Sequence, residues 1–204
     1  HFRQMGVVYM TLCHNGDNDI CDSARGHAEH GGLSAFGQEV VREMNALGMM
    51  IDMSHAAESS FYDALALSQA PIVCSHSSSR ALCSHPRNLT DDQMKALAAQ
   101  GGVAQVTLYH GFLRHEGEAT VLDALDHLHH MVQVMGPEHV GIGTDFDGDG
   151  GVRGLKDASE LIGFTRQLLR RRYSESDLQG IWGGNFLRVM RQVQSSATSH
   201  LGLS

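Results

Sequence analysis

The chain has 204 residues, and its 15 Lys and Arg against 23 Asp and Glu give a net charge of −8 with histidine counted as neutral. Its 42% hydrophobic and 19% charged residues match soluble globular proteins, so the composition excludes a disordered chain and a coiled coil. The sequence shows neither an apolar run of about 18 residues nor a signal-peptide pattern, and its acidic balance argues against a nucleic acid partner.

Five short apolar segments are predicted to form strands. They comprise residues 7–13, 49–54, 72–75, 102–107 and 140–144. A segment with helical spacing separates each of them from the next. Because parallel neighbours need a long crossover connection, this strict alternation predicts a parallel sheet in an α/β fold.

Helices are predicted between and after these strands. Hydrophobic residues recur at helical spacing from Phe36 to Leu47, from Phe61 to Ser68 and from Val121 to Met135. Two or three further helices are expected between residues 157 and 190.

Two capping boxes mark further helix starts. Thr90 with Gln93 opens one helix, and Ser174 with Asp177 is a variant of the same pattern. The three prolines all lie at junctions between predicted elements, so nothing divides the chain into two domains. We therefore expect one domain over residues 1–194 and a disordered polar tail over 195–204.

Polar residues follow the predicted strands. In chain order they are His14, His55, His76, Tyr109 with His110, and Asp145. A single histidine in such a place is most often structural, but the carboxyl ends of parallel strands meet at one edge of the sheet. The repetition therefore favours a shared functional site at that edge.

His55 and His76 form the clearest candidate for a metal site. They are separated by one strand-helix-strand unit, so they should end adjacent strands about 5 Å apart. Zinc accepts imidazole nitrogen and needs three or four protein ligands, so the pair requires a carboxylate or a third histidine. Asp145 is the nearby candidate, either as a ligand or as a base.

Two loops carry further charged residues. Residues 145–150 imitate the start of an EF-hand, but a strand precedes them and Lys156 stands at the twelfth place, so Asp147 and Asp149 are interpreted as turn residues. Arg87 follows the strand that ends at His76. It is either an exposed cation or a clamp for a carboxylate. The segment 182–185, with its two glycines, is assigned to packing between helices.

The four cysteines are predicted to be free thiols. They are Cys13, Cys21, Cys74 and Cys83, and no two of them form a CxxC pair. Free thiols favour a reducing compartment such as the cytoplasm. A signal upstream of this sequence would instead direct the protein to the periplasm or the exterior.

Several stretches resemble the renal dipeptidase family, also called membrane dipeptidases. They read YMTLCHNGDND, GLSAFGQEVVREMNALGMMIDMSH, APIVCSHSSSRALCSHPRNL, HVGIGTDFDGD and WGGNFLRVM. The resemblance extends from the first residues to about Gln192. It implies a zinc peptidase of the amidohydrolase type, built on a (β/α)8 TIM-type barrel.

The resemblance also implies roles for individual residues. His55 and His76 match two histidines that hold one ion of a binuclear zinc site. His14 would polarise the scissile carbonyl or stabilise the tetrahedral intermediate. Arg87 would bind the substrate carboxylate, and Asp145 would take the proton of the attacking water. The implied substrate is a small dipeptide, and we allow for assembly into a homodimer.

The sequence departs from the family pattern in its first half. It has no His-x-Asp pair within the first 50 residues and no Glu before Glu29, although the family uses both elements to hold zinc. The chain is therefore expected to be the carboxyl-terminal part of a longer protein, with only the last five of eight barrel strands. Alone, it should be inactive and prone to aggregate at its two open edges.

Two other interpretations remain open. One is a truncated or pseudoenzyme α/β domain that binds a metal or a peptide-like ligand without turnover. The other, an unrelated doubly wound binding domain, is disfavoured because no GxGxxG follows the first strand.

Overall fold

The computed structural model describes residues 1–197 and contains one parallel sheet. Its strands are β1 (Tyr9–Thr11), β2 (Met50–Asp52), β3 (Val73–Cys74), β4 (Val103–Val106) and β5 (Val140–Ile142). They lie side by side in chain order, and every neighbouring pair is parallel. The predicted parallel α/β fold is confirmed.

Each strand is shorter than its predicted segment, and β2 and β3 show the reason. Met53 still donates its backbone N–H to the carbonyl of Val73 at 2.8 Å. The next two donors, the backbone N–H groups of Ser54 and Ser75, instead bond to the carboxylate of Asp52 at 3.0 and 2.9 Å. A side chain thus replaces the ladder, and the strands end there.

Helices fill the connections between strands and close the chain. The longer ones are α1 (Ala35–Leu47), α2 (Glu58–Leu67), α3 (Asp91–Ala99), α5 (Val121–Met135), α6 (Leu161–Arg170) and α8 (Asn185–Ser195). Shorter ones are α4 (His110–Leu113), α7 (Glu175–Gln179), η1 (Pro137–His139), η2 (Ala158–Glu160) and the π-helical η3 (Gly180–Gly184). The predicted helices are confirmed, while the single turn of α4 was not predicted.

Local sequence explains where these helices begin and end. Both predicted capping boxes form at α3 and α7, and α5 begins with a third one, made by Thr120 and Asp123. Ser34 caps α1 by accepting the N–H of Gly37 at 2.9 Å. The same helix ends at Gly48, whose φ of 67° is the left-handed conformation that glycine adopts without strain.

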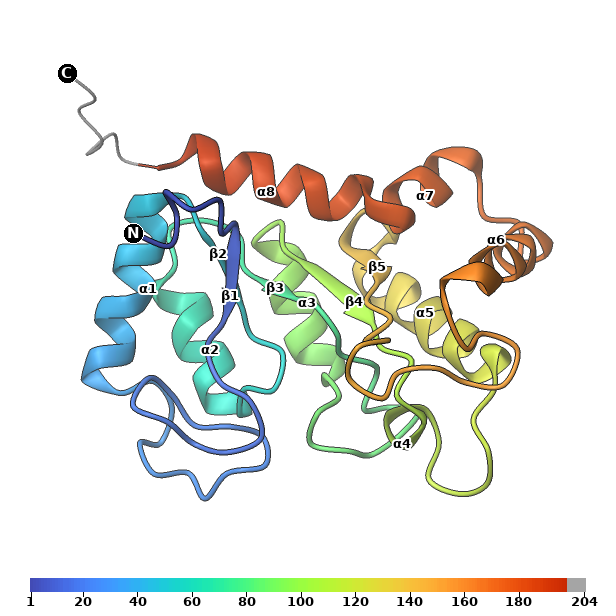
Figure 1. Cartoon of the computed structure of the whole chain (residues 1–204), viewed down its shortest axis with the longest axis horizontal. Coiled ribbons are helices and arrows are strands. Elements are labelled where there is room, and N and C mark those ends of the chain that lie inside the picture. The colour runs from blue at the N-terminus through green and yellow to red at the C-terminus, as the bar shows by residue number, and fades with distance from the viewer. Residues whose placement is uncertain (198–204) are drawn as a thin grey trace.

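The strand order places the main helices on one face of the sheet. Right-handed crossovers that always advance in the same direction bring each connecting helix to the same side. On the other face, α8 crosses the amino-terminal ends of the strands, where Val189 and Val193 pack against Met50, Val73 and Val103. The loops that follow the strands therefore lie at the opposite end of the molecule (Figure 1).

The buried face of α1 differs from the prediction by one residue. Gly37, Val41 and Met44 face the core, whereas Phe36 is 55% exposed. Gly37 allows this rotation, since a Cβ there would lie 1.9 Å from the carbonyl oxygen of Ile20. In α5, Leu122 likewise points outward and the buried side begins at Ala124.

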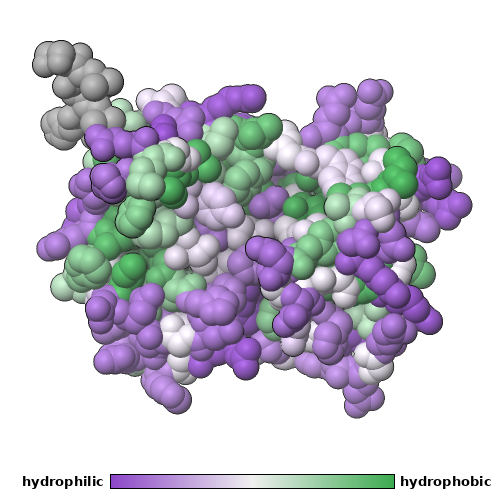
Figure 2. All heavy atoms as spheres, viewed as in Figure 1, coloured by the Kyte–Doolittle hydropathy of each residue, from purple (hydrophilic) through white to green (hydrophobic). Residues whose placement is uncertain are grey.

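Hydrophobic surface remains exposed beside β1. In the described part of the chain β1 pairs with β2 alone and β5 with β4 alone, so both are edge strands. The exposed side chains near this edge are Phe2, Met5, Val7, Tyr9 and Phe36. Figure 2 shows the hydrophobic surface over this side of the molecule. The predicted open edges are present.

The two chain-wide expectations about cysteines and the tail have different outcomes. All four cysteines are free, as predicted, and all four are buried. Ser195 belongs to α8 and donates its hydroxyl to the carbonyl of Gln192 at 2.8 Å, so a tail starting at residue 195 is wrong at its first position. Residues 198–204 lie outside the described residues.

Within residues 1–197, no helix has the length and hydropathy needed to cross a membrane.

Candidate functional site

Three strand-end histidines come together at the carboxyl edge of the sheet. The Nε2 atoms of His55 and His76 lie 2.8 Å apart, and their ring centroids 4.9 Å apart. The ring of His14 lies 4.4 Å from that of His55. The structure thus brings together the three histidines that strand order alone predicted to be neighbours.

His55 is held in a strained backbone conformation. Its φ of 72° is uncommon for a residue with a Cβ and costs on the order of 1–3 kcal/mol. The loop after β1 supports this conformation. The carbonyl of His55 accepts the backbone N–H of Ala24 at 2.7 Å and the hydroxyl of Ser23 at 3.2 Å. Such strain is concentrated at functional positions, and here it aims an imidazole at His76.

Both facing imidazoles are held neutral. The pKa of His55 is lowered to about 3, mainly by burial and secondly by the positive charge of Arg87. The same two causes, in the same order, lower the pKa of His76. Neutral imidazole is the form that binds metal ions. The Nδ1 atom of His55 is also buried and has no hydrogen-bond partner among the described residues.

Arg87 is buried, so its interpretation as an exposed loop cation is wrong. The side chain is 3% exposed, one Nη donates to the carbonyl of His76 at 3.3 Å, and the guanidinium lies 5.3 Å from the ring centroid of Phe112. Burial lowers its pKa to about 10, so it remains charged at neutral pH. Its Nε has no partner within residues 1–197. A buried cation with a free donor is suited to bind an anionic group.

Asp145 closes the site from the β5 side. It is half-buried and left-handed at φ 57°, and its carbonyl accepts the N–H groups of Gly148 and Gly150 at 2.9 and 2.7 Å. Burial raises the pKa of its carboxyl, and nearby Asp147 adds to this while His76 opposes it. The tight turn agrees with the interpretation of Asp147 and Asp149 as turn residues.

One cavity joins the three histidines and Asp145, and Arg87 is not among its lining residues. It has a volume of about 550 Å³, and its lining includes His14, His55, His76, Asp145 and Asp147. Tyr109 and His110 do not line it; they begin the short helix α4, where His110 is exposed. The strand-end pattern therefore predicted the clustering of His14, His55, His76 and Asp145 around one cavity, and it included two residues that lie elsewhere.

Sequence reasoning missed the buried carboxylate of Asp52. It accepts hydrogen bonds from the hydroxyls of Thr11 and Ser75 at 2.7 and 2.5 Å, and Ser75 also contacts His76. A charged residue inside the apolar segment MMIDMS was the available signal, because an acidic side chain is buried only when it is well hydrogen-bonded.

The metal-ligand set is incomplete within the described residues. His55 and His76 converge, but in that part of the chain no group of three His, Cys, Asp or Glu side chains is placed to hold one ion. The pair of imidazole nitrogens and the unpartnered Nδ1 of His55 nevertheless fit half of a zinc coordination shell. Asp145 is thus not placed as the third ligand.

Comparisons with known proteins agree with this architecture. The sequence model of membrane dipeptidases (peptidase family M19) matches residues 1–201. An uncharacterized dipeptidase of Schizosaccharomyces pombe is 41% identical over 200 residues, which cover 95% of this chain and 48% of that protein. The chain spans about half the length of the curated relatives it matches.

Solved structures give the same result. The probable dipeptidase PvdM from Pseudomonas aeruginosa superimposes with a TM-score of 0.93 at 31% identity, covering 96% of this chain and 65% of that one. A metallopeptidase from Rhodobacter sphaeroides, bound to a phosphinate mimic of the dipeptide L-Ala-D-Ala, superimposes with a TM-score of 0.88 at 26% identity, covering 94% and 57%. Since the family model matches nearly the whole length, this chain belongs to the membrane dipeptidase family.

Proposed function

We propose that the protein carrying this chain hydrolyses dipeptides at a binuclear zinc centre, one ion of which is held by His55 and His76. The convergence of their Nε2 atoms at the carboxyl edge of the sheet carries this proposal. Membership in the dipeptidase family supports the substrate class, as does the dipeptide mimic bound to the metallopeptidase from Rhodobacter sphaeroides.

The residues present fit zinc better than a hard cation. Imidazole nitrogen suits zinc, whereas calcium and magnesium prefer oxygen ligands. When bound, zinc supplies Lewis acidity that polarises a carbonyl and activates water. Within the described residues no third ligand joins the pair. The remaining ligands, including a carboxylate shared by both ions, would come from outside them.

The other residues of the site account for binding and proton transfer. Arg87 would hold the carboxylate of the dipeptide, because its buried Nε is free to donate. His14 would donate from its ring to the carbonyl oxygen of the scissile bond, since it lies against His55. The carboxylate of Asp145 would take a proton from the attacking water and pass it to the leaving amine nitrogen.

The sheet would form part of a (β/α)8 barrel. Its strands run in chain order without the reversal of a doubly wound sheet, and its helices cover one face. The superposition on PvdM leaves about a third of that longer chain uncovered, which provides room for further strands. The edges at β1 and β5 would then be paired in the complete domain.

Hydrolysis of a small dipeptide panel, with and without added zinc, tests the proposed function. We expect the protein that includes the remaining barrel strands to be active with zinc, and this chain alone to be inactive. Zinc binding without turnover in the longer protein would defeat the proposal and favour a pseudoenzyme that binds metal or a peptide-like ligand.

A further inference from the structure

Asp52 is a buried carboxylate whose two oxygens face only donors within the described residues. Oδ1 accepts the backbone N–H groups of Ser54 and Ser75 at 3.0 and 2.9 Å. Oδ2 accepts the hydroxyls of Thr11 and Ser75 at 2.7 and 2.5 Å. These bonds join the carboxyl ends of β1, β2 and β3 around one fully buried side chain.

The hydroxyl of Ser75 links this carboxylate to His76. Its Oγ lies 2.5 Å from Oδ2 of Asp52 and 2.8 Å from Nδ1 of His76. A serine hydroxyl has one proton, and the carboxylate is acceptor-only, so that proton lies toward Asp52. Ser75 can then only accept from His76, which requires a proton on Nδ1. Neutral imidazole carries one N–H, so its Nε2 presents a lone pair toward His55.

We propose that Asp52 acts through Ser75 as a positioning residue that fixes His76 in the Nδ1–H tautomer, with Nε2 free to ligate a metal ion. The proposal rests on the proposed function only in taking His76 as a ligand. A metal-ligating histidine commonly donates its other N–H to a carboxylate or carbonyl, which fixes its tautomer. Here a serine hydroxyl stands between the imidazole and the carboxylate.

The backbone of His76 is anchored by the same cluster. Its N–H donates to the hydroxyl of Ser54 at 2.9 Å, next to the N–H by which Ser54 bonds Asp52. His55 has no comparable support, since its Nδ1 lacks a partner in the described region. His76 is therefore the pre-oriented ligand of the pair, and His55 depends on backbone strain for its orientation.

Asp52→Asn provides the sharpest test because it is isosteric and reverses the hydrogen-bond chain. The amide oxygen can still accept from the two backbone N–H groups, while its NH₂ would donate to the Ser75 hydroxyl. Ser75 would then donate to Nδ1 of His76, which moves the imidazole proton to Nε2 and blocks the ligating lone pair. The nitrogen-15 chemical shifts of the His76 ring distinguish these tautomers in metal-free protein.

Two further variants separate positioning from general stability. Ser75→Ala removes the link but retains Asp52, so His76 should populate both tautomers. Thr11→Val removes a second hydroxyl bonded to the same Oδ2 atom without touching His76, so it serves as the matched control. We expect the Kd for Zn²⁺, measured by calorimetry, to rise by about 10- to 100-fold in Asp52→Asn and in Ser75→Ala. In Thr11→Val it should stay close to the wild-type value.

The outcomes are decisive without any assay of hydrolysis. A wild-type His76 protonated at Nε2, or an Asp52→Asn protein that keeps Nδ1–H, would overturn the proposal, as would unchanged zinc affinity in Asp52→Asn and Ser75→Ala. If Asp52→Asn does not fold, the tautomer and affinity of Ser75→Ala decide. A protein that binds zinc through His76 but does not hydrolyse dipeptides would refute the proposed function and leave this inference standing.

Discussion

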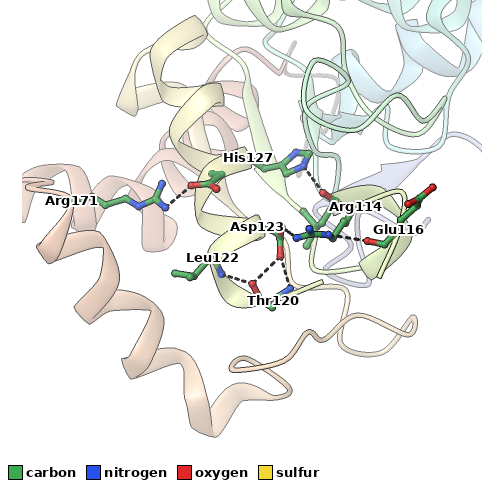
Figure 3. Close-up of polar contacts among 9 residues, drawn as sticks. Arg114, Glu116, Thr120, Leu122, Asp123, His127 and Arg171 are labelled. Atoms are coloured by element: carbon green, nitrogen blue, oxygen red, sulfur yellow. Dashed lines mark hydrogen bonds and ion pairs between the residues drawn. The ribbon is translucent and has the colours of Figure 1, made fainter. Parts of the chain in front are cut away.

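Two cavities of similar size are both lined by histidine and aspartate, but they differ in how the polar side chains around them are paired. The strand-end cavity measures about 550 Å³, and a cavity between α4 and α5 measures about 500 Å³. In the second one, Arg114 bonds Asp123 at 2.9 Å and the carbonyl of Glu116 at 2.8 Å (Figure 3). Asp123 also completes the cap of α5.

His127 continues this pattern of mutual satisfaction beside the α4–α5 cavity. Its Nδ1 accepts the N–H of Ser79 at 3.0 Å and its Nε2 donates to the carbonyl of Leu113 at 3.1 Å. At the strand-end site, His55 lines the cavity and Arg87 bonds the carbonyl of His76, and each retains a buried nitrogen with no partner in residues 1–197. Paired groups stabilise the fold, whereas unpaired buried nitrogens gathered at one site indicate a ligand. Cavity size alone does not separate the two cases.

Removing a converging imidazole should have the largest effect. We expect His55→Ala or His76→Ala in the complete protein to lose one zinc per chain and to abolish dipeptide turnover, because two-metal hydrolysis needs both ions. Metal analysis and a dipeptide assay measure the two effects. His110→Ala is the control, since this exposed histidine also follows a strand but lies outside the cavity. Unchanged zinc content in both site variants would show that the strand-end histidines do not hold a metal ion, and the two cavities would then not differ in function.

Asp145→Asn should have the next largest effect. The amide cannot accept the proton of the attacking water, so kcat should fall by about 10²-fold or more while the substrate still binds. Asn tolerates the left-handed backbone of Asp145, so the turn should persist. Asp149→Asn, at an exposed position with φ of 66°, should keep its kcat. A near-normal kcat for Asp145→Asn would transfer the role to Asp147 or Asp149.

Arg87→Lys should lower kcat/KM for dipeptides by about 10-fold or more and leave zinc content unchanged. The lysine keeps the charge but loses the planar fork that holds a carboxylate with two bonds. Arg114→Lys alters the paired arginine of the other cavity and should not change kcat/KM. An equal loss by Arg87→Lys on a dipeptide whose carboxylate is amidated would show that Arg87 does not bind that group.

The fold and the site differ in how far the sequence predicts them. His55 and His76 could be placed side by side because strand ends and strand order determine their positions. The hydrogen-bonded link from Asp52 through Ser75 to His76 could not be predicted from the sequence. It depends on the strand register that places Asp52 opposite Val73 and on the direction of the Ser75 hydroxyl. Burial of Arg87 was also missed. The loop after β3 folds back on itself, and the backbone N–H of Arg80 donates to the carbonyl of Leu89 at 2.8 Å. No periodicity in the sequence predicts this contact.

His127 provides the smallest and most selective prediction, which concerns stability at acid pH. Burial lowers its pKa, the Leu113 carbonyl and the carboxylates of Asp123 and Asp126 oppose the shift, and His130 adds to it. Its unfolded pKa is about 6.5. Below that pH the unfolded chain binds a proton that the folded imidazole resists, so the stabilisation is complete above pH 6.5 and is lost as the pH falls toward the lower folded value.

His127→Gln isolates this contribution, because His55, His76 and His85 also have lowered pKa values and titrate equally in both proteins. At pH 7.5 the variant should be less stable by about 0.5–1.5 kcal/mol, since one or both hydrogen bonds of the imidazole weaken. Urea unfolding at pH 7.5 and 5.5 should show the wild-type advantage shrinking at the lower pH. A constant advantage would mean that the folded and unfolded chains bind the His127 proton equally, so that the fold does not lower the pKa of this imidazole. In that case its pairing would not be the feature that distinguishes it from the strand-end histidines.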